Sequence, residues 1–215
     1  MQLDIIFDTV CPWCYIGKRR LERALAKRPN MDVELTWRPF LLNPDMPPGG
    51  IDRTAYLIKK FGSETRVRRV YGAIGEAGLS VEIDFAFDRI RRTPNSVSSH
   101  RLVRFAQQFI NPAPLVERLF EAYFIDGQDI GDLDFLTETG VAFGIDEGRL
   151  SRYLQSDADV QTIYDENARA HRLGINGVPA FAAEGHMVIS GAQEPEVLVR
   201  VLDAANVASR TAASA

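Results

Sequence analysis

The feature that most constrains this chain is the four-residue sequence Cys11-Pro12-Trp13-Cys14, which holds both of its cysteines. It follows the apolar, strand-like residues 3–7 and precedes a helix-like run over residues 15–28. The free N–H groups at a helix N-terminus carry partial positive charge, and this field favours a thiolate over a thiol. Since two intervening residues place the sulfurs about one helical turn apart, a disulfide can close between them. We therefore expect a redox-active pair in which Cys11 is the more nucleophilic thiol.

Two other roles of a cysteine pair fit less well. A zinc site usually has four ligands, often from a second CxxC or a paired histidine motif. This chain has no other cysteine, and its histidines, at 100, 171 and 186, are scattered. We interpret His171 and His186 as ordinary surface or strand residues. A structural disulfide across two residues would restrain little unfolded-chain entropy, and Pro12 suits the first position of a helix. The pattern therefore predicts a reactive dithiol and no metal site.

Composition limits the class of protein. The chain has 215 residues, of which 46% are hydrophobic, and a formal net charge of −4. It can bury a sizeable core in one large domain or in one domain with an insertion. The charge points away from nucleic acid, and no apolar run reaches the length of a membrane span. Met1 leads almost directly into the first strand without a secretory leader. We therefore expect a cytoplasmic protein, in which a CxxC pair is more often catalytic than structural.

The first 45 residues predict a strand, a helix and a second strand. Residues 2–7 are near-continuously apolar, which is typical of a buried central strand. A helix follows over about 12–28, and the alternating residues 33–37 predict the second strand. Six basic side chains surround the apolar face of the helix: Lys18, Arg19, Arg20, Arg23, Lys27 and Arg28. We interpret them as a solvated face rather than an anion site. Prolines and glycines from 44 to 50 then form a linker.

The pattern from Asp52 to Leu173 is helical. The expected helices run from Asp52 to Gly62, Ser63 to Gly78, Pro114 to Gly127, Asp132 to Gly140, Asp146 to Gln155 and Ser156 to Leu173, with a further amphipathic helix that carries Leu102, Phe105, Ala106 and Phe109. Residues 79–94 predict a loop with extended pieces. After Gly174 we expect a hairpin of residues 180–183 and 186–189 around a turn at 184–185, a helix over 195–205, and a frayed end at 209–215.

A second segment of chemical interest is Gly177-Val178-Pro179, directly before the strand at 180–183. Proline cannot donate to a sheet ladder, so it suits the first residue of a strand. A cis Val178–Pro179 bond would leave the backbone of Val178 free to pair with an extended peptide or a thiol ligand, whereas a trans bond would form an ordinary turn. Since only about one X–Pro bond in twenty is cis in folded proteins, the residues alone leave both conformations open.

Four further residues have open roles. Asp8 could accept the proton of Cys14, although we favour an ordinary loop carboxylate. Asn95 and His100 flank the expected start of a helix, where Asn95 or Ser96 suits an N-cap. Trp13 lies between the two sulfurs, so we expect it to be partly exposed and to contact substrate.

Several of these segments together resemble the DsbA-like thioredoxin superfamily, and most closely its FrnE-like branch. The segments that carry the resemblance are Phe7-Asp8 with Cys11-Pro12-Trp13-Cys14-Tyr15-Ile16-Gly17, Arg38-Pro39-Phe40 with Leu42-Asn43-Pro44, Asn95 with His100-Arg101-Leu102, Gly177-Val178-Pro179-Ala180-Phe181, and Ser190-Gly191-Ala192-Gln193. They span most of the chain. A CxxC alone is a moderate signal, but CPWC with a later Val-Pro before a strand and a helical segment in between is a strong one.

The resemblance implies an α/β fold, with a thioredoxin-like sheet and a helical insertion domain. Residues 1–45 and 174–215 would form the discontinuous thioredoxin-like domain, and residues 46–173 the insertion. Pro179 would be a cis proline that faces the cysteines. Kappa-class glutathione transferases and 2-hydroxychromene-2-carboxylate isomerases share this layout, commonly with a serine at the first active position and glutathione beside it. Asn95 and His100 align near their glutathione site, which leaves glutathione open as a co-substrate.

We therefore hypothesise a cytoplasmic thiol–disulfide oxidoreductase or isomerase, a monomer or homodimer that requires no cofactor. Its partners would be protein thiols and disulfides or glutathione. The expected catalytic residues are Cys11 as nucleophile, Cys14 as resolving thiol, and Pro179. The expected substrate-binding residues are Pro12, Trp13, Gly177, Val178, Asn95 and His100. The alternative is a glutathione-dependent isomerase or transferase that acts on a small aromatic or polyketide-like molecule, and a third hypothesis is a non-catalytic binding module. The presence of both cysteines favours redox chemistry.

Overall fold

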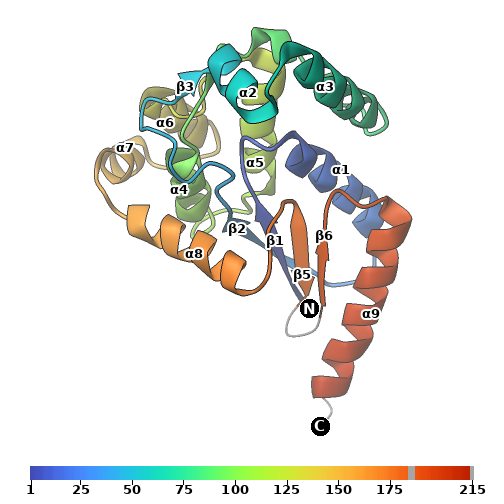
Figure 1. Ribbon diagram of the computed structural model, residues 1–215. Coiled ribbons are helices and arrows are strands. Elements are labelled where there is room, and N and C mark those ends of the chain that lie inside the picture. Colours follow the sequence, from blue (N-terminus) through green and yellow to red (C-terminus); the bar gives the residue numbers. More distant parts are fainter. Residues whose placement is uncertain (184–186, 214–215) are drawn as a thin grey trace.

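A four-stranded sheet lies at the centre of the computed structural model, which describes residues 1–183 and 187–213 (Figure 1). The strand order is β2-β1-β5-β6, with β1 Gln2–Phe7, β2 Glu34–Pro39, β5 Ala180–Ala183 and β6 Met187–Ser190. β1 pairs in parallel with β2 and antiparallel with β5, so Ile5 lies between Trp37 and Phe181. β5 and β6 are antiparallel neighbours. The expected turn at 184–185 and His186 lie outside the described residues.

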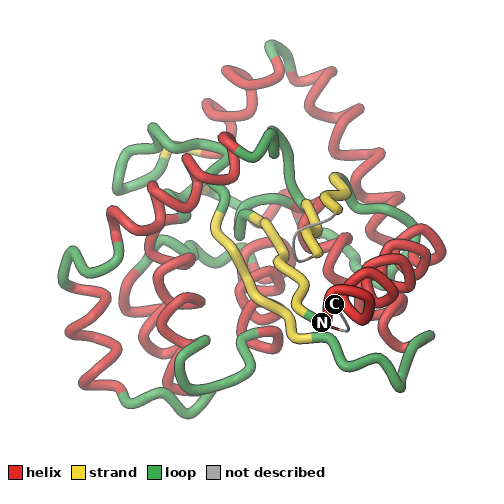
Figure 2. The backbone as a smooth tube through the Cα atoms, turned by 90° about the horizontal axis from the view of Figure 1, so that it is seen from below, coloured by secondary structure: helices red, strands yellow, loops and turns green. Residues whose placement is uncertain are grey.

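Most of the chain between β2 and β5 is helical. The helices of the described residues are α1 Pro12–Ala26, α2 Arg53–Phe61, α3 Glu64–Leu79, α4 Val97–Ala106, α5 Ala113–Glu121, α6 Leu133–Ala142, α7 Glu147–Gln155, α8 Val160–Arg172 and α9 Pro195–Ala213. A π-helical turn, Ala122–Asp126, extends α5 to Gly127. The ambiguous segment 79–94 holds a 3-10 turn, Phe87–Arg89, and the strand β4 Arg92–Thr93, which pairs with β3 Ile51–Asp52. Helices flank the strands on both sides (Figure 2).

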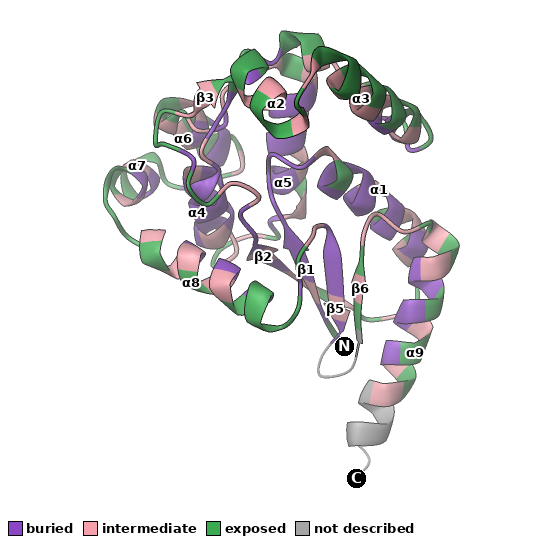
Figure 3. Cartoon of the chain, in the orientation of Figure 1, coloured by how far each residue is buried: buried purple, intermediate pink, exposed green. Residues whose placement is uncertain are grey.

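One hydrophobic cluster joins the sheet to the helical segment. Phe7 at the end of β1 makes edge-to-face ring contacts with Trp37, His100 and Phe120, at centroid distances of 5.0, 5.0 and 6.2 Å. Buried residues of α1, α4 and α5 belong to the same hydrophobic cluster as Phe7, and buried positions are coloured purple along these helices in Figure 3. The sheet and the helical segment therefore share a core. The division into an insertion at 46–173 and a discontinuous domain stays a prediction. Among the described residues, no helix is both long and apolar enough to cross a membrane.

Three expected helix boundaries are wrong. Ser156 is the C-cap of α7 and does not open α8, because its hydroxyl accepts the Ala158 N–H at 3.2 Å and this local turn replaces the first helical turn. α8 begins only at Val160. α9 continues through Ala213 beyond the predicted end at 205, since no glycine or proline interrupts it. Phe109 lies past the end of α4 and is half exposed.

The prediction of a wholly solvated basic face on α1 is also wrong. Lys18 and Arg20 are buried. Lys18 lies 2.5 Å from a carboxylate oxygen of Glu117 on α5 and 2.6 Å from one of Glu22, and Arg20 lies 2.7 Å from Glu194, directly before α9. A buried cation is tolerated when it is paired and hydrogen-bonded. These ion pairs therefore connect α1 to α5 and to the start of α9.

Candidate active site

The two thiols lie at the N-terminus of α1. Cys11 is its N-cap residue with extended backbone angles (φ −99°, ψ 112°), and Pro12 occupies the first helical position, where no N–H is needed. The Cys14 N–H donates to the Cys11 carbonyl at 3.0 Å, which turns the two residues between the cysteines into the start of the helix. Both thiols are free and buried, with 4% and 2% of their surface exposed, whereas Trp13 between them is 37% exposed. Trp13 is therefore partly exposed, as its place between the two sulfurs predicted.

The segment before β5 meets this helix terminus. The Val178–Pro179 peptide bond is cis, and the Cys11 thiol lies 3.7 Å from the Val178 carbonyl oxygen, at hydrogen-bond distance for sulfur. Pro179 is buried, whereas Gly177 and Val178 are half-buried. The Pro179 carbonyl accepts the Gly191 N–H at 2.7 Å. Two segments about 167 residues apart thus meet at one sulfur atom.

The two thiols have different surroundings. Burial raises the pKa of the Cys14 thiol well above its ordinary value, and the neighbouring Cys11 raises it further. A backbone hydrogen bond from Asp8 acts in the opposite direction, whereas the negative charge of Asp8 adds to the increase. Cys14 therefore keeps its proton in the reduced protein. Cys11 occupies the N-terminal end of α1, where the helix carries partial positive charge.

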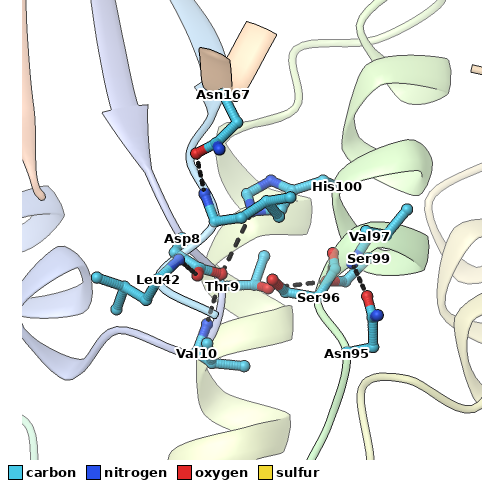
Figure 4. Close-up of polar contacts among 11 residues, drawn as sticks. Asp8, Thr9, Val10, Leu42, Asn95, Ser96, Val97, Ser99, His100 and Asn167 are labelled. Carbon is cyan, nitrogen blue, oxygen red and sulfur yellow. Dashed lines mark hydrogen bonds and ion pairs between the residues drawn. The ribbon is translucent and has the colours of Figure 1, made fainter. Parts of the chain in front are cut away.

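Asp8 is the centre of a buried polar network behind the thiols (Figure 4). One carboxylate oxygen accepts the Val10 N–H at 3.3 Å and lies 3.3 Å from His100 Nε2, and the other accepts the Leu42 N–H at 2.8 Å. Asp8 and His100 are both buried. Asp8 is a loop residue, as expected, but it is fully enclosed and joins three segments: the loop before α1, the loop after β2, and α4. The position of Asp8 three residues before Cys11 does not by itself predict that its carboxylate is buried.

A second set of polar contacts holds α4 against the same loop. Thr9 and Ser99 share a hydrogen bond of 2.8 Å. Asn95 accepts the Val97 N–H at 2.9 Å (Figure 4). It also donates to the Met46 carbonyl at 2.6 Å. Asn95 therefore ties the turn before α4 to the loop at Met46, whereas the N-cap of α4 is Ser96, which makes no side-chain cap hydrogen bond.

His100 contacts Asp8, which lies behind the thiols. His100 is buried, so it is not in contact with solvent. From α8, Asn167 accepts the Leu41 N–H at 2.8 Å and so holds the loop after β2. Asn167 could not be singled out from its neighbours in the chain, because its partner is 126 residues away. Exposed His171 contacts the ring of Phe40, and His186 lies outside the described residues.

In the described part of the chain, no group of three or more His, Cys, Asp or Glu side chains is arranged to hold a metal ion. A cleft of about 620 Å³ lies between α8 and the sheet, lined by residues that include Asp4, Arg38 and Arg169, and neither cysteine borders it. A smaller cleft of about 390 Å³ lies between the loop at 42–46 and α2. The smaller one borders Leu42, whose N–H is bound to Asp8 beside the thiols.

Most of the chain is similar to known proteins. Residues 2–203 match the family model described as DSBA-like thioredoxin domain. The uncharacterized protein YwbO of Bacillus subtilis is 28% identical over 204 residues, which cover 94% of this chain and 96% of YwbO.

Solved structures share the fold. The crystal structure of probable DsbA oxidoreductase SCO1869 from Streptomyces coelicolor has a TM-score of 0.86 at 28% identity and covers 95% of this chain and 89% of that one. The cytosolic disulfide reductase DsbM of Pseudomonas aeruginosa with GSH has a TM-score of 0.65 at 17% identity, covering 95% and 98%. A 2-hydroxychromene-2-carboxylate isomerase has a TM-score of 0.68, also at 17%, covering 100% and 98%. The last two similarities are similarities of fold.

Proposed function

The chain belongs to the family of DSBA-like thioredoxin domains, and from this premise we propose that it is a thiol–disulfide oxidoreductase with Cys11 and Cys14 as its dithiol. The observation that carries the proposal is the pair of free thiols at the start of α1, with Cys11 against the carbonyl of Val178. A serine at the first position would not support this chemistry. The name of the similar Streptomyces protein supports the same class of activity.

The proposed reaction proceeds by two exchanges. The Cys11 thiolate attacks one sulfur of a substrate disulfide, an S–S bond forms between them, and the other substrate sulfur leaves as a thiolate that takes up a proton. Cys14 then loses its proton and attacks the sulfur of Cys11. The second substrate thiolate leaves, and a Cys11–Cys14 disulfide remains. Two electrons pass from the dithiol to the substrate, and the reverse sequence oxidises a dithiol substrate.

Backbone groups beside Cys11 are suited to hold the substrate. Val178 is half-buried and lies against the nucleophile, and half-buried Gly177 directly precedes it in the chain, so an extended segment that reaches Cys11 can pair with this backbone. Pro12 and Trp13 present the other side of the contact. We propose protein thiols and disulfides as partners, with glutathione as a co-substrate and no other cofactor, in the cytoplasm. The proposals of glutathione and of the cytoplasm are supported by the similar fold of the cytosolic disulfide reductase DsbM, whose structure contains GSH.

Insulin reduction by dithiothreitol tests the proposal. The wild-type protein should accelerate the turbidity that follows reduction of insulin, and the Cys11→Ser protein should not. A Ser156→Ala protein is the matched control, since this residue lies at the end of α7. Equal turbidity with and without the wild-type protein would contradict the proposal.

A glutathione-dependent isomerase or transferase is the second candidate. The observation that favours it is the similarity of fold to 2-hydroxychromene-2-carboxylate isomerase over the whole chain. The two candidates differ in their need for Cys14. An isomerase that uses bound glutathione should keep its activity in a Cys14→Ser protein, whereas multiple turnover by a dithiol oxidoreductase should be lost. Silence in the insulin assay together with tight glutathione binding would select this second candidate.

A further inference from the structure

The two helices α2 and α3 carry an excess of positive charge on a chain that is acidic as a whole. The chain holds 25 basic and 29 acidic side chains, and residues 53–69 hold six of the basic ones but only one of the acidic ones. Five of these six are exposed, and together they form what we call the basic hairpin surface: Lys59, Lys60, Arg66, Arg68 and Arg69. Figure 1 shows α2 and α3 at the upper edge of the molecule.

Most of the charge on the basic hairpin surface is not neutralised. Arg68 pairs with Glu64, one turn earlier on α3, at 3.4 Å, but both side chains are exposed, and such a pair contributes little. Lys60 donates to the uncharged hydroxyl of Tyr56 at 2.8 Å. Among the residues that the structure describes, no carboxylate forms an ion pair with the other four members of the surface.

The basic face of α1 shows the opposite arrangement. Every one of its basic side chains forms an ion pair with a carboxylate: Lys18, Arg19, Arg20, Arg23, Lys27 and Arg28. The carboxylates come mainly from other elements, such as Glu117 on α5 and Asp203 on α9. The positive charge of α1 is therefore used within the molecule, whereas that of the basic hairpin surface is free to attract an external partner.

The helix dipoles explain only part of the unpaired charge. Lys59 and Lys60 lie in the last turn of α2, where the partial charge of a helix is negative. Arg66 lies in the first turn of α3, where the helix itself adds positive charge. A Cβ added at Gly62, between the two helices, would lie 3.7 Å from the Arg66 guanidinium. The Arg66 side chain therefore lies against this turn, close to the end of α2, so that cations of both helices gather there.

A cleft of about 390 Å³ adjoins this surface, between α2 and the loop at 42–46. Lys59 and Lys60 border it on the side of α2, and Asp45 is its one acidic lining residue. The apolar part of the lining consists of Leu42, Pro44, Met46 and Ile51. Pockets of this size hold small ligands or side chains of a bound partner. An occupant of the cleft would thus combine an apolar group with negative charge beside the lysines.

We propose that the basic hairpin surface and the cleft together bind an acidic segment of a partner protein. Asp and Glu side chains of the segment would lie against the cations, and an apolar side chain would enter the cleft. Charge complementarity of this kind selects the partner and speeds the encounter. A long polyanion fits less well, because the rest of the chain has an excess of acidic side chains and would repel negative charge beyond the surface. The inference goes beyond the proposed function, since this binding needs neither thiol.

Fluorescence anisotropy with a labelled peptide of Glu-Glu-Leu repeats tests the proposal on the full chain. The peptide has no cysteine, so thiol exchange plays no part. It should bind, and the affinity should fall about fivefold in Arg66→Gln/Arg69→Gln and in Lys59→Gln/Lys60→Gln, as expected when two exposed charge contacts are lost. The matched control is Lys27→Gln/Arg28→Gln, which also removes two positive charges but from the paired face of α1. The control should keep the affinity.

Two further probes separate the cleft from charge alone. A peptide of Glu-Glu-Ser repeats should bind more weakly than the Glu-Glu-Leu peptide, because it leaves the cleft empty, and a peptide of Lys-Lys-Leu repeats should not bind. Equal binding of the leucine and serine peptides, or an equal loss of affinity in the control and the hairpin variants, would overturn the proposal. Displacement of the labelled peptide by duplex DNA or by phosphatidylserine vesicles at a lower concentration of negative charge than by unlabelled peptide would also overturn it. Failure of this test would leave the result of the insulin assay unaffected.

Discussion

The buried carboxylate of Asp8 connects the loop before α1 to the loop after β2 and to α4. Its two oxygens receive backbone N–H groups from Val10 and Leu42, and His100 lies against one of them. Its charge also contributes to the raised pKa of Cys14. One carboxylate thus holds the loop that carries the nucleophile and sets part of the electrostatic environment of the second thiol.

We expect Asp8→Asn to destabilise the protein by about 1–3 kcal/mol. Either orientation of the new amide places its NH₂ group against a backbone N–H, because both oxygens of Asp8 now accept from a backbone donor. The urea midpoint of the reduced protein measures the effect. Asp45→Asn, which removes a charge from the exposed side of the neighbouring loop, should change stability by less than about 0.5 kcal/mol. If Asp8→Asn lost no more stability than Asp45→Asn, the two backbone hydrogen bonds to the Asp8 carboxylate would not contribute to stability as expected.

The raised pKa of Cys14 predicts how stability depends on pH. A thiol whose pKa is higher in the folded than in the unfolded protein contributes stability that is fully present below the unfolded pKa and is lost as pH rises through the folded pKa. The reduced wild-type protein should therefore lose stability above about pH 8.5, the ordinary thiol value, with a slope of up to about 1.4 kcal/mol per pH unit. Urea midpoints between pH 7 and pH 9.5 should fall more steeply than those of Cys14→Ser. If the urea midpoints of the two proteins fell equally with pH, the raised pKa of Cys14 would be contradicted.

At the scale of elements, the approach of α1 to the segment before β5 positions the nucleophile. Gly17 lies on the face of α1 that meets Pro179, and a Cβ at this position would come within 2.6 Å of the Pro179 ring. The absence of a side chain is what allows the helix that begins at Cys11 to pack against the segment that carries Val178. The sulfur–carbonyl contact of 3.7 Å depends on this packing.

Gly17→Ala should therefore lower stability by about 1–3 kcal/mol, the usual effect of overpacking, and slow thiol exchange at Cys11. Gly72→Ala is the matched control, since Gly72 is an exposed residue of helix α3 with nothing within 4 Å of its added Cβ. This control should raise stability by about 0.5–1 kcal/mol, because alanine is the better helix former. Thermal unfolding and the rate of Cys11 alkylation measure both effects. Equal effects of the two substitutions would show that α1 and the Pro179 segment can separate freely.

At the scale of the whole molecule, the sheet and the helical segment share ring contacts and one hydrophobic cluster. We expect them to unfold together. Fluorescence of Trp37, which is buried on β2, reports on the sheet, whereas far-UV circular dichroism is dominated by the helices. The two signals should give one coincident urea transition in a protein whose exposed Trp13 is replaced by Phe. Two separated transitions would instead support independent domains.

The local pattern of residues predicted the elements well where each carries its own signal. The strand before CxxC, the helix after it and the helices expected to begin at Asp52, Asp132 and Asp146 lie where the pattern indicated, and each of these aspartates caps its helix. The resemblance to a known family supplied the arrangement of the sheet. The burial of Lys18 could not be predicted, because its partner Glu117 is 99 residues away.

The same limit applies to the candidate site. Cys11, Cys14 and the segment at Val178 were identified from their residue types, and the structure brings them together. The unpaired charge of the basic hairpin surface is visible only when the acidic partners of the other cations are known. Ser156 shows the opposite error: a good capping residue closed one helix with a local turn instead of opening the next.

The most direct measurement compares covalent capture by the two single-cysteine proteins. Each is mixed with a disulfide-bonded peptide, and the mixed disulfide is followed by mass spectrometry. The Cys14→Ser protein should form a persistent adduct on Cys11, because the nucleophile is present and the resolving thiol is absent. The Cys11→Ser protein should form none on the same timescale, since its remaining thiol is buried and protonated. Faster capture by Cys14, or no capture by either protein, would contradict the assignment of Cys11 as the nucleophile of a thiol–disulfide oxidoreductase.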